Sequence, residues 1–129
     1  MFDHNLSPKL ARAFGVFFKG EHIVETVRDR FLPSIKDIDM FDALSQNGHW
    51  VFISGDRRIT KIKAERTVFI SSKLTGFFLS PGLAKAPEVK KLERIASLWS
   101  TIETTVRTVQ PGAMFELPMT SSQVKQIKY

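Results

Sequence analysis

The chain is divided into short segments whose apolar residues follow two different spacings. Runs of β-branched and aromatic residues are typical of strands, whereas apolar residues three or four positions apart are typical of helices. The first pattern predicts strands at residues 1–2, 22–27, 50–54, 75–80 and 114–117. The second predicts helices at residues 8–18, 38–46, 59–65 and 87–109, and residues 28–36 are predicted to form a loop.

Two of these helices begin at residues that favour helix initiation. Ser7 before Pro8 predicts an N-cap followed by the first helical residue. Asp37 can cap the next helix through the free N–H groups of its first turn. The spacing in the first helix predicts a buried face made of Leu10, Ala13, Phe14 and Phe17.

The alternation of strands and helices predicts an α/β fold, a three-layer α/β/α sandwich around a mostly parallel sheet of four or five strands. Ligands of such a sheet bind beyond the carboxyl ends of the strands, near the point where the strand order reverses. If the order is 2-1-3-4, the strands at residues 1–2 and 50–54 are neighbours. We expect one domain over residues 1–118, followed by a polar tail over residues 119–129 that is flexible or docked on a partner.

Composition narrows the classes of partner. The 129 residues include 19 Lys and Arg against 13 Asp and Glu, and the net charge of +6 favours an acidic partner such as nucleic acid. There is no cysteine, which excludes disulfides and thiolate zinc sites. With neither a signal-peptide pattern nor a bilayer-spanning apolar run, we expect a cytoplasmic protein with no membrane partner. The two-residue first strand leaves open whether residue 1 is the true start.

Several acidic residues follow or precede the predicted central strands. Asp3 follows the first strand, Asp56 follows the strand at residues 50–54, and Asp37 and Asp39 open the helix before that strand. Gathered carboxylates repel one another, and Mg²⁺ or Mn²⁺ would offset that repulsion through hard oxygen ligands, with Asn5 as a further oxygen donor. Such a centre activates water and clamps a phosphodiester. The alternative is that these residues form turns and that Asp37 is an N-cap.

Arginines lie close to the same strand ends in the sequence. Arg28 and Arg30 follow the second predicted strand, and Arg57 and Arg58 follow Asp56 directly. They are candidates for binding RNA phosphates, while the alternative is that they are solvated loop charges. Of the three histidines, only His4 lies beside a candidate acid and is a candidate substitute ligand.

The segments "FDHNLSPKLARAF" and "DIDMFDALSQNGHWVFISGDRRI" resemble PIN-like nuclease domains, most closely the compact branch related to VapC-type toxins. That branch commonly reads Leu-Asp-Glu-Asn-Leu-Pro-Pro at its start, with an acid at a helix start and a Thr-x-Asp at the end of a strand. The resemblance covers residues 1 to about 80, and it carries over to Asp3, Asn5, Asp37 and Asp56. It implies a Mg²⁺- or Mn²⁺-dependent endoribonuclease, the toxin of a toxin–antitoxin pair with a cognate antitoxin as partner, and leaves open a homodimer.

Two positions depart from the pattern of that family. His4 replaces a usual acid, and Arg58 stands where a further acid often follows the strand-end aspartate. These departures support an alternative, a weak or inactive PIN-like scaffold that acts as a protein- or RNA-interaction module. A phosphoacceptor receiver domain is a third reading, but the chain lacks the two adjacent acids after strand one and the lysine near the last strand that it requires.

Overall fold

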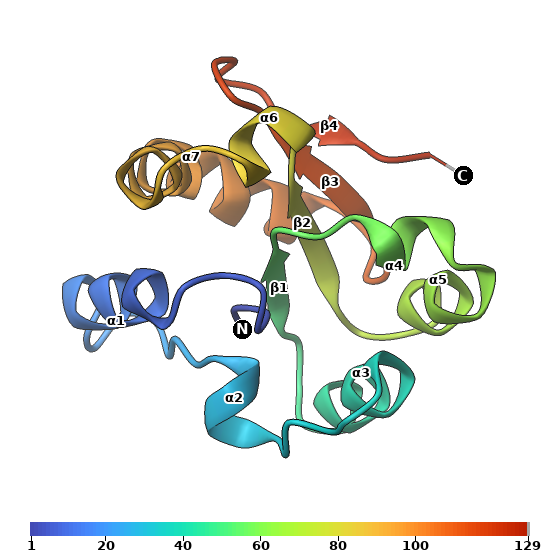
Figure 1. Cartoon of the computed structure of the whole chain (residues 1–129). Coiled ribbons are helices and arrows are strands. Elements are labelled where there is room, and N and C mark those ends of the chain that lie inside the picture. The colour runs from blue at the N-terminus through green and yellow to red at the C-terminus, as the bar shows by residue number, and fades with distance from the viewer. Residues whose placement is uncertain (129) are drawn as a thin grey trace.

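The computed structural model of the chain describes residues 1–128, and helices and strands alternate along it (Figure 1). The strands are β1 (Val51–Ser54), β2 (Thr75–Leu79), β3 (Met114–Leu117) and β4 (Lys125–Gln126). The helices are α1 (Pro8–Phe17), α2 (Val27–Arg30), α3 (Asp37–Ser45), α4 (Arg58–Lys61), α5 (Lys63–Ile70), α6 (Pro81–Ala84) and α7 (Glu88–Thr108). Within residues 1–128 no helix has both the length and the apolar character needed to cross a bilayer.

The sheet is open and mostly parallel. Its strands lie in the order β1-β2-β3-β4, the first two pairs are parallel, and β4 is antiparallel to β3. Beyond β1, Phe2 forms parallel bridges to Ile53 on one side and to Thr26 on the other. The N-terminal segment therefore lies between Thr26 and β1, as the order 2-1-3-4 requires, although residues 1–2 and 22–27 each contribute a single bridging residue and no full strand.

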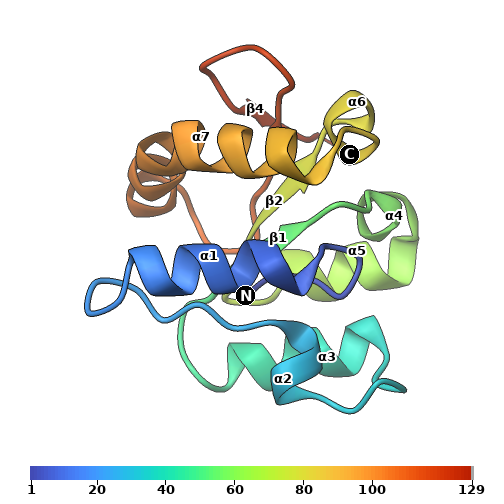
Figure 2. The ribbon, with the colours of Figure 1, turned by 60° about the vertical axis from the view of Figure 1, so that its left-hand side comes forward.

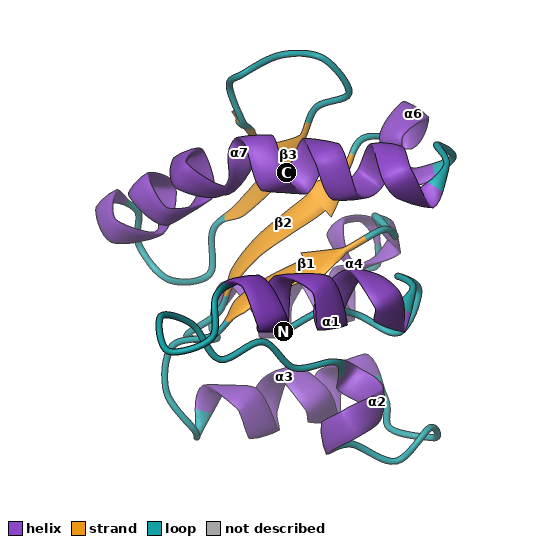
Figure 3. Ribbon diagram, turned by 90° about the vertical axis from the view of Figure 1, so that its left-hand side faces the viewer, coloured by secondary structure: helices purple, strands orange, loops and turns teal. Residues whose placement is uncertain are grey.

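Helices cover both faces of the sheet, as the α/β/α prediction requires (Figures 2 and 3). On one face, α1 and α7 pack over a cluster in which Phe14 stacks on Trp99 with ring centroids 5.0 Å apart. On the other face, α3 and α5 pack over a second cluster, in which Phe41 meets Phe69 edge to face at 5.1 Å. Apolar residues on both faces explain why β2 is buried at every position.

The predicted strand at residues 22–27 does not form. Only Thr26 pairs, because the N-terminal segment offers a single bridging residue, Phe2, to a neighbour on that side. Thr26 then turns the chain into α2: its side chain accepts from the N–H of Asp29, and the Asp29 carboxylate accepts from the N–H of Thr26. The predicted loop at residues 28–36 therefore begins with one helical turn.

Three further features differ from the sequence prediction: the extent of one helix, the buried face of α1 and the cap of α3. The helix predicted at residues 59–65 is two helices, α4 and α5, which meet at Ile62 in an extended conformation. In α1, Leu10 and Phe14 are buried as predicted, together with Ala11, whereas Ala13 and Phe17 of the predicted face are exposed, Phe17 at 76%. Asp37 makes no side-chain cap and is the first residue of α3.

The end of the chain contributes to the sheet. The predicted strand at 114–117 forms β3, which lies between β2 and β4. Glu116 and Lys125 occupy paired positions in that antiparallel ladder, and the N–H of Ile127 donates to the carbonyl of Met114. Residues 125–127 of the polar segment are thus held on the sheet by β3.

Candidate metal centre

Two acids follow neighbouring strands at the same edge of the sheet. Asp3 comes directly after Phe2, and its N–H donates to the carbonyl of Ile53 in β1. Asp56 lies two residues beyond Ser54, the last residue of β1. Because the N-terminal segment runs parallel to β1, both acids lie at the carboxyl ends of their strands, where parallel sheets bind ligands.

The Asp3 carboxylate is buried, with a relative exposure of 3%, and each of its oxygens has two polar contacts. Its Oδ2 accepts from Ser54 Oγ at 2.9 Å and from Asn5 Nδ2 at 3.3 Å. Its Oδ1 accepts from the N–H of His4 at 2.7 Å and lies 2.8 Å from His4 Nδ1. These contacts compensate the cost of removing a carboxylate from water.

Ser54 and Asn5 connect this carboxylate to the loop that carries Asp56. Ser54 Oγ accepts from the N–H of Asp56 at 3.1 Å, and Asn5 Oδ1 accepts from the N–H of Gly55 at 3.0 Å. Ser54 is fully buried and contacts Asp3 and Asp56 with the same hydroxyl. The positions of the two acids are therefore fixed to each other through one serine and one asparagine.

Asp37 and Glu65 come from α3 and α5 and share the electrostatic environment of these acids. Burial raises the pKa of Asp37, and the nearby charges of Asp3 and Asp56 add to that increase. Burial also raises the pKa of Glu65, and the charges of Asp37 and Asp56 add to it. One oxygen of Glu65 is buried without a hydrogen-bond partner. We call Asp3, Asp37, Asp56 and Glu65 the acid cluster.

Arg58 is bound to the acid cluster. Its backbone N–H donates to Asp56 Oδ1 at 2.9 Å, and its Nε–H donates to Asp56 Oδ2. The side-chain bond to Asp56 and the charge of that carboxylate raise the pKa of Arg58, with smaller contributions from Asp37 and Glu65. The guanidinium therefore carries a positive charge among three of the four carboxylates.

A cleft opens beside the acid cluster. Its volume is about 380 Å³, and its wall includes His4, Arg28 and Asp37 together with apolar side chains of the 31–35 segment. Among the latter are Phe31, which is partly exposed, and Leu32, which is 76% exposed. A ligand bound here would meet one carboxylate, one guanidinium and one aromatic ring.

The sequence model of the PIN-like domain matches residues 1–81, a stretch that contains the whole acid cluster. The chain belongs to the PIN-like domain family. No curated protein and no solved structure shows a significant match. The match stops at the level of the family, so the relation to VapC-type toxins stays a prediction.

PIN-like domains are commonly nucleases, and PIN domains generally use divalent metals. The donor chemistry here fits such an ion, because the cluster offers hard carboxylate oxygens whose mutual repulsion a dication would relieve. The unpartnered oxygen of Glu65 is a further available donor. As the side chains stand, no three Asp, Glu, His or Cys residues within 1–128 converge on one ion position.

The four arginines predicted to bind RNA lie in different surroundings. Arg28 Nη2 donates to the carbonyl of His4 at 3.1 Å, beside the cleft. Arg57 lies 3.6 Å from Glu116 of β3, and Arg58 binds Asp56. Arg30 pairs with Glu25 at 2.8 Å and lies over Trp50, which precedes β1. The structure thus binds Arg58 to the acid cluster and places Arg28 at the cleft beside it, whereas Arg57 and Arg30 pair with glutamates outside the cluster.

Two members of the site were not singled out from the sequence, and one candidate is left outside it. Ser54 occupies the threonine position of the family's Thr-x-Asp pattern, which was the available signal. Glu65 lies in a basic stretch, "KIKAER", and nothing local distinguishes it. Asp39, offered together with Asp37, is exposed and has no described contact with the cluster.

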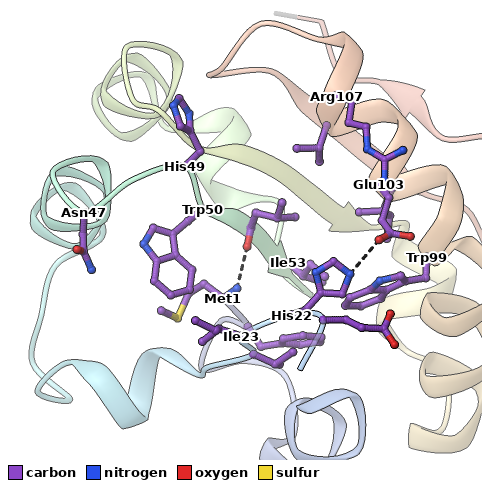
Figure 4. Close-up of a pocket in the computed structure, with 16 residues that line it drawn as sticks. Met1, His22, Ile23, Asn47, His49, Trp50, Ile53, Trp99, Glu103 and Arg107 are labelled. Carbon is purple, nitrogen blue, oxygen red and sulfur yellow. Dashed lines mark hydrogen bonds and ion pairs between the residues drawn. The ribbon is translucent and has the colours of Figure 1, made fainter. Parts of the chain in front are cut away.

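A larger cavity, of about 580 Å³, lies at the other end of β1 (Figure 4). Trp50 and Trp99 stand on opposite sides of it, and His22 Nε2 lies 2.9 Å from Glu103 Oε2 on its wall. Its lining contains none of the acid cluster. The cleft beside His4 and Asp37, although smaller, is therefore the one of these two that lies beside the acid cluster.

Proposed function

We propose that this PIN-like domain is a metal-dependent endoribonuclease. The observation that carries the proposal is that carboxylates from four separate segments act on one another: the charges of Asp3 and Asp56 raise the pKa of Asp37, and those of Asp37 and Asp56 raise the pKa of Glu65. Burial and mutual repulsion disfavour such an arrangement unless a cation offsets it. Because gathering these carboxylates is energetically unfavourable, their presence in a member of a nuclease family supports a role in catalysis more than a role in stability.

Asp3, Asp37 and Asp56 would hold Mg²⁺ or Mn²⁺, with Asn5 as an oxygen donor. When bound, such an ion supplies an activated water and a charge that stabilises the phosphodiester transition state. Ser54 positions Asp3 against Asp56 through its hydroxyl. Asp37, held partly buried with a raised pKa, faces the cleft and contributes charge close to where a phosphate would lie.

RNA is the substrate that the surroundings support. The net charge of +6 favours a polyanion, and Arg28 lines the cleft beside the acids. Phe31 in the same cleft offers an aromatic surface on which an unpaired base can stack. A single strand with splayed bases fits an open cleft of this kind better than a duplex does.

Cleavage of a labelled single-stranded RNA with Mn²⁺ tests the proposal. We expect Asp37→Asn and Asp56→Asn to lower the rate by at least about a hundredfold, the scale of losing one electrostatic stabiliser. Asp39→Asn is the matched control, since Asp39 is exposed in the same helical turn. Equal cleavage rates for Asp37→Asn and the unmodified protein would refute the assignment. A loss of cleavage confined to Asp39→Asn would show that Asp39, and not Asp37, belongs to the site.

A second candidate function is an inactive scaffold that binds RNA or protein. The bonds between Arg58 and Asp56 favour it, because they occupy both oxygens of one acid. Calorimetric titration with Mn²⁺ separates the two functions. Millimolar or tighter binding that Asp3→Asn abolishes supports the nuclease, and absence of binding supports the scaffold.

The toxin interpretation adds a biological prediction. If the domain is the toxin of a toxin–antitoxin pair, its expression in a bacterial host arrests growth, and the Asp56→Asn variant does not. Co-expression of the protein encoded by a neighbouring small open reading frame would then restore growth. Normal growth with a stable, RNA-cleaving protein would count against the toxin role alone.

A further inference from the structure

Arg58 occupies a distinctive place in the acid cluster. Both of the hydrogen bonds that Arg58 is described as donating go to the same carboxylate, and they engage both Asp56 oxygens. Asp37 and Glu65 also act on its charge. A positive group bonded to one acid and close to two more stands where a divalent cation would be most stabilised.

The other strand-end acid is bound in a similar way. His4 Nδ1 lies 2.8 Å from Asp3 Oδ1, so each of these acids is contacted by the side chain of a nearby basic residue. The two basic side chains differ in exposure, and that of His4 is 52% exposed. The Arg58 side chain is 72% exposed, and its other described contacts are electrostatic only.

We propose that Arg58 is an internal cation that competes with a divalent metal for Asp56 and must leave the acid cluster before the metal binds. This inference rests on the proposed function, because it assumes the same metal centre. The proposed metal centre includes Glu65 as its fourth carboxylate, because one Glu65 oxygen is buried without a described hydrogen-bond partner. In the metal-bound state the Arg58 side chain is released to solvent, where it can contact a phosphate of the RNA.

Releasing the Arg58 side chain from Asp56 requires little free energy. An exposed ion pair is weak, so withdrawing the guanidinium costs little. The backbone N–H of Arg58 keeps its bond to Asp56 Oδ1, which leaves the loop in place while Oδ2 becomes available. The competition also resolves the conflict between a nuclease family and a bound Asp56, because the bond to Nε is reversible.

The experiment measures Mn²⁺ affinity by the electron paramagnetic resonance signal of the free ion, without RNA. Arg58→Gln is expected to bind Mn²⁺ roughly two- to fivefold more tightly than the unmodified protein, the range set by the strength of an exposed ion pair. Arg28→Gln is the matched control. It removes an equal charge at the cleft beside the acid cluster, yet the described hydrogen bond of Arg28 goes to the carbonyl of His4 and not to a carboxylate. We expect its gain in affinity to be smaller.

A second readout follows Arg58 itself. In the unmodified protein, Mg²⁺ should shift the Nε–H resonance of Arg58 toward that of free arginine, and Asp37→Asn should weaken this response. Equal Mn²⁺ affinity in the unmodified protein and Arg58→Gln, or an equal gain in Arg28→Gln, would overturn the inference. So would an Arg58 resonance that does not respond to saturating Mg²⁺.

The two proposals fail in different ways. If Asp37→Asn abolishes Mn²⁺ binding while Arg58→Gln leaves it unchanged, the metal centre stands and the competition does not. If Asp3→Asn, Asp37→Asn and Asp56→Asn all leave Mn²⁺ binding unchanged, the proposed metal centre is wrong. A Glu65→Gln variant with unaltered affinity would remove only Glu65 from the centre.

Discussion

Replacing Ser54 by alanine tests how the structure holds its two strand-end acids together. Its buried hydroxyl donates to Asp3 Oδ2 at 2.9 Å and accepts from the N–H of Asp56 and from Asn5 Nδ2, both at 3.1 Å. The substitution leaves a buried carboxylate with one donor fewer and a backbone N–H without its partner. We expect Ser54→Ala to lower the free energy of unfolding without changing the fold.

The size of the effect follows from these contacts. A hydrogen bond to a charged group contributes about 1.5–3 kcal/mol, and a buried donor left unpaired costs about 1–3 kcal/mol. Because the Asp56 loop can relax toward water, the total expected is about 2–4 kcal/mol. A small domain has about 5–15 kcal/mol of stability, so the variant should still fold.

The assay is urea unfolding of a double-mutant cycle with Ser54→Ala, Asp3→Asn and the combined variant. Because the Ser54–Asp3 bond involves a charge, the two effects should be coupled by at least about 1 kcal/mol. Ser72→Ala is the matched control, since its buried hydroxyl bonds only the neutral backbone of Phe69 and Leu74. It should cost about 1 kcal/mol and add independently to Asp3→Asn.

Two results would refute the reasoning. One is a Ser54→Ala cost below about 0.5 kcal/mol, within the range of ordinary surface substitutions. The other is additivity of Ser54→Ala and Asp3→Asn. A Ser54→Thr variant, which keeps the hydroxyl and matches the family pattern, should retain the coupling.

Three further outcomes follow from the structure. Asp37→Asn should stabilise the metal-free protein at neutral pH, because the raised pKa of Asp37 means that its ionised form opposes folding. The gain in the free energy of unfolding should therefore vanish as the pH falls toward the ordinary pKa of an aspartate. Gly112→Ala should cost about 2–4 kcal/mol in urea unfolding, because Gly112 has φ +91° and a Cβ would lie 2.1 Å from the carbonyl oxygen of Ile70. Arg28→Gln should weaken RNA binding equally for different sequences and reduce the slope of log affinity against log salt concentration by about 0.7, measured by fluorescence anisotropy.

The spacing of apolar residues correctly predicted the elements that are defined by a long or continuous apolar pattern. The runs at 50–54 and 75–80 form β1 and β2, and the long three-four spacing forms α7. The segment at 22–27 has an equally strand-like composition but finds only one bridging residue to pair with. Strand composition is a local property, whereas strand formation requires a neighbour of sufficient length.

In the candidate site, too, some residues were predictable from local sequence and others depended on how distant segments pack. The order of the strands and the rule for parallel sheets placed Asp3 and Asp56 at one edge, and the structure brings Asp37 to them from α3. Glu65 could not be found in this way, since no signal in "KIKAER" shows which side of α5 faces the other acids. The residue that holds the arrangement together, Ser54, is one of several serines in the chain until its buried contacts are known.

By itself, the sequence determined the α/β class and the alternation of elements and marked Asp3, Asp37 and Asp56 as candidates, because periodicity, strand ends and helix starts are encoded locally. Tertiary structure decided which polar groups meet. Only the packing of α3 and α5 against β1 adds Asp37 and Glu65 to the acid cluster, and only the turn into α4 places Arg58 on Asp56. Such encounters depend on the distances between separate segments, which no local pattern specifies.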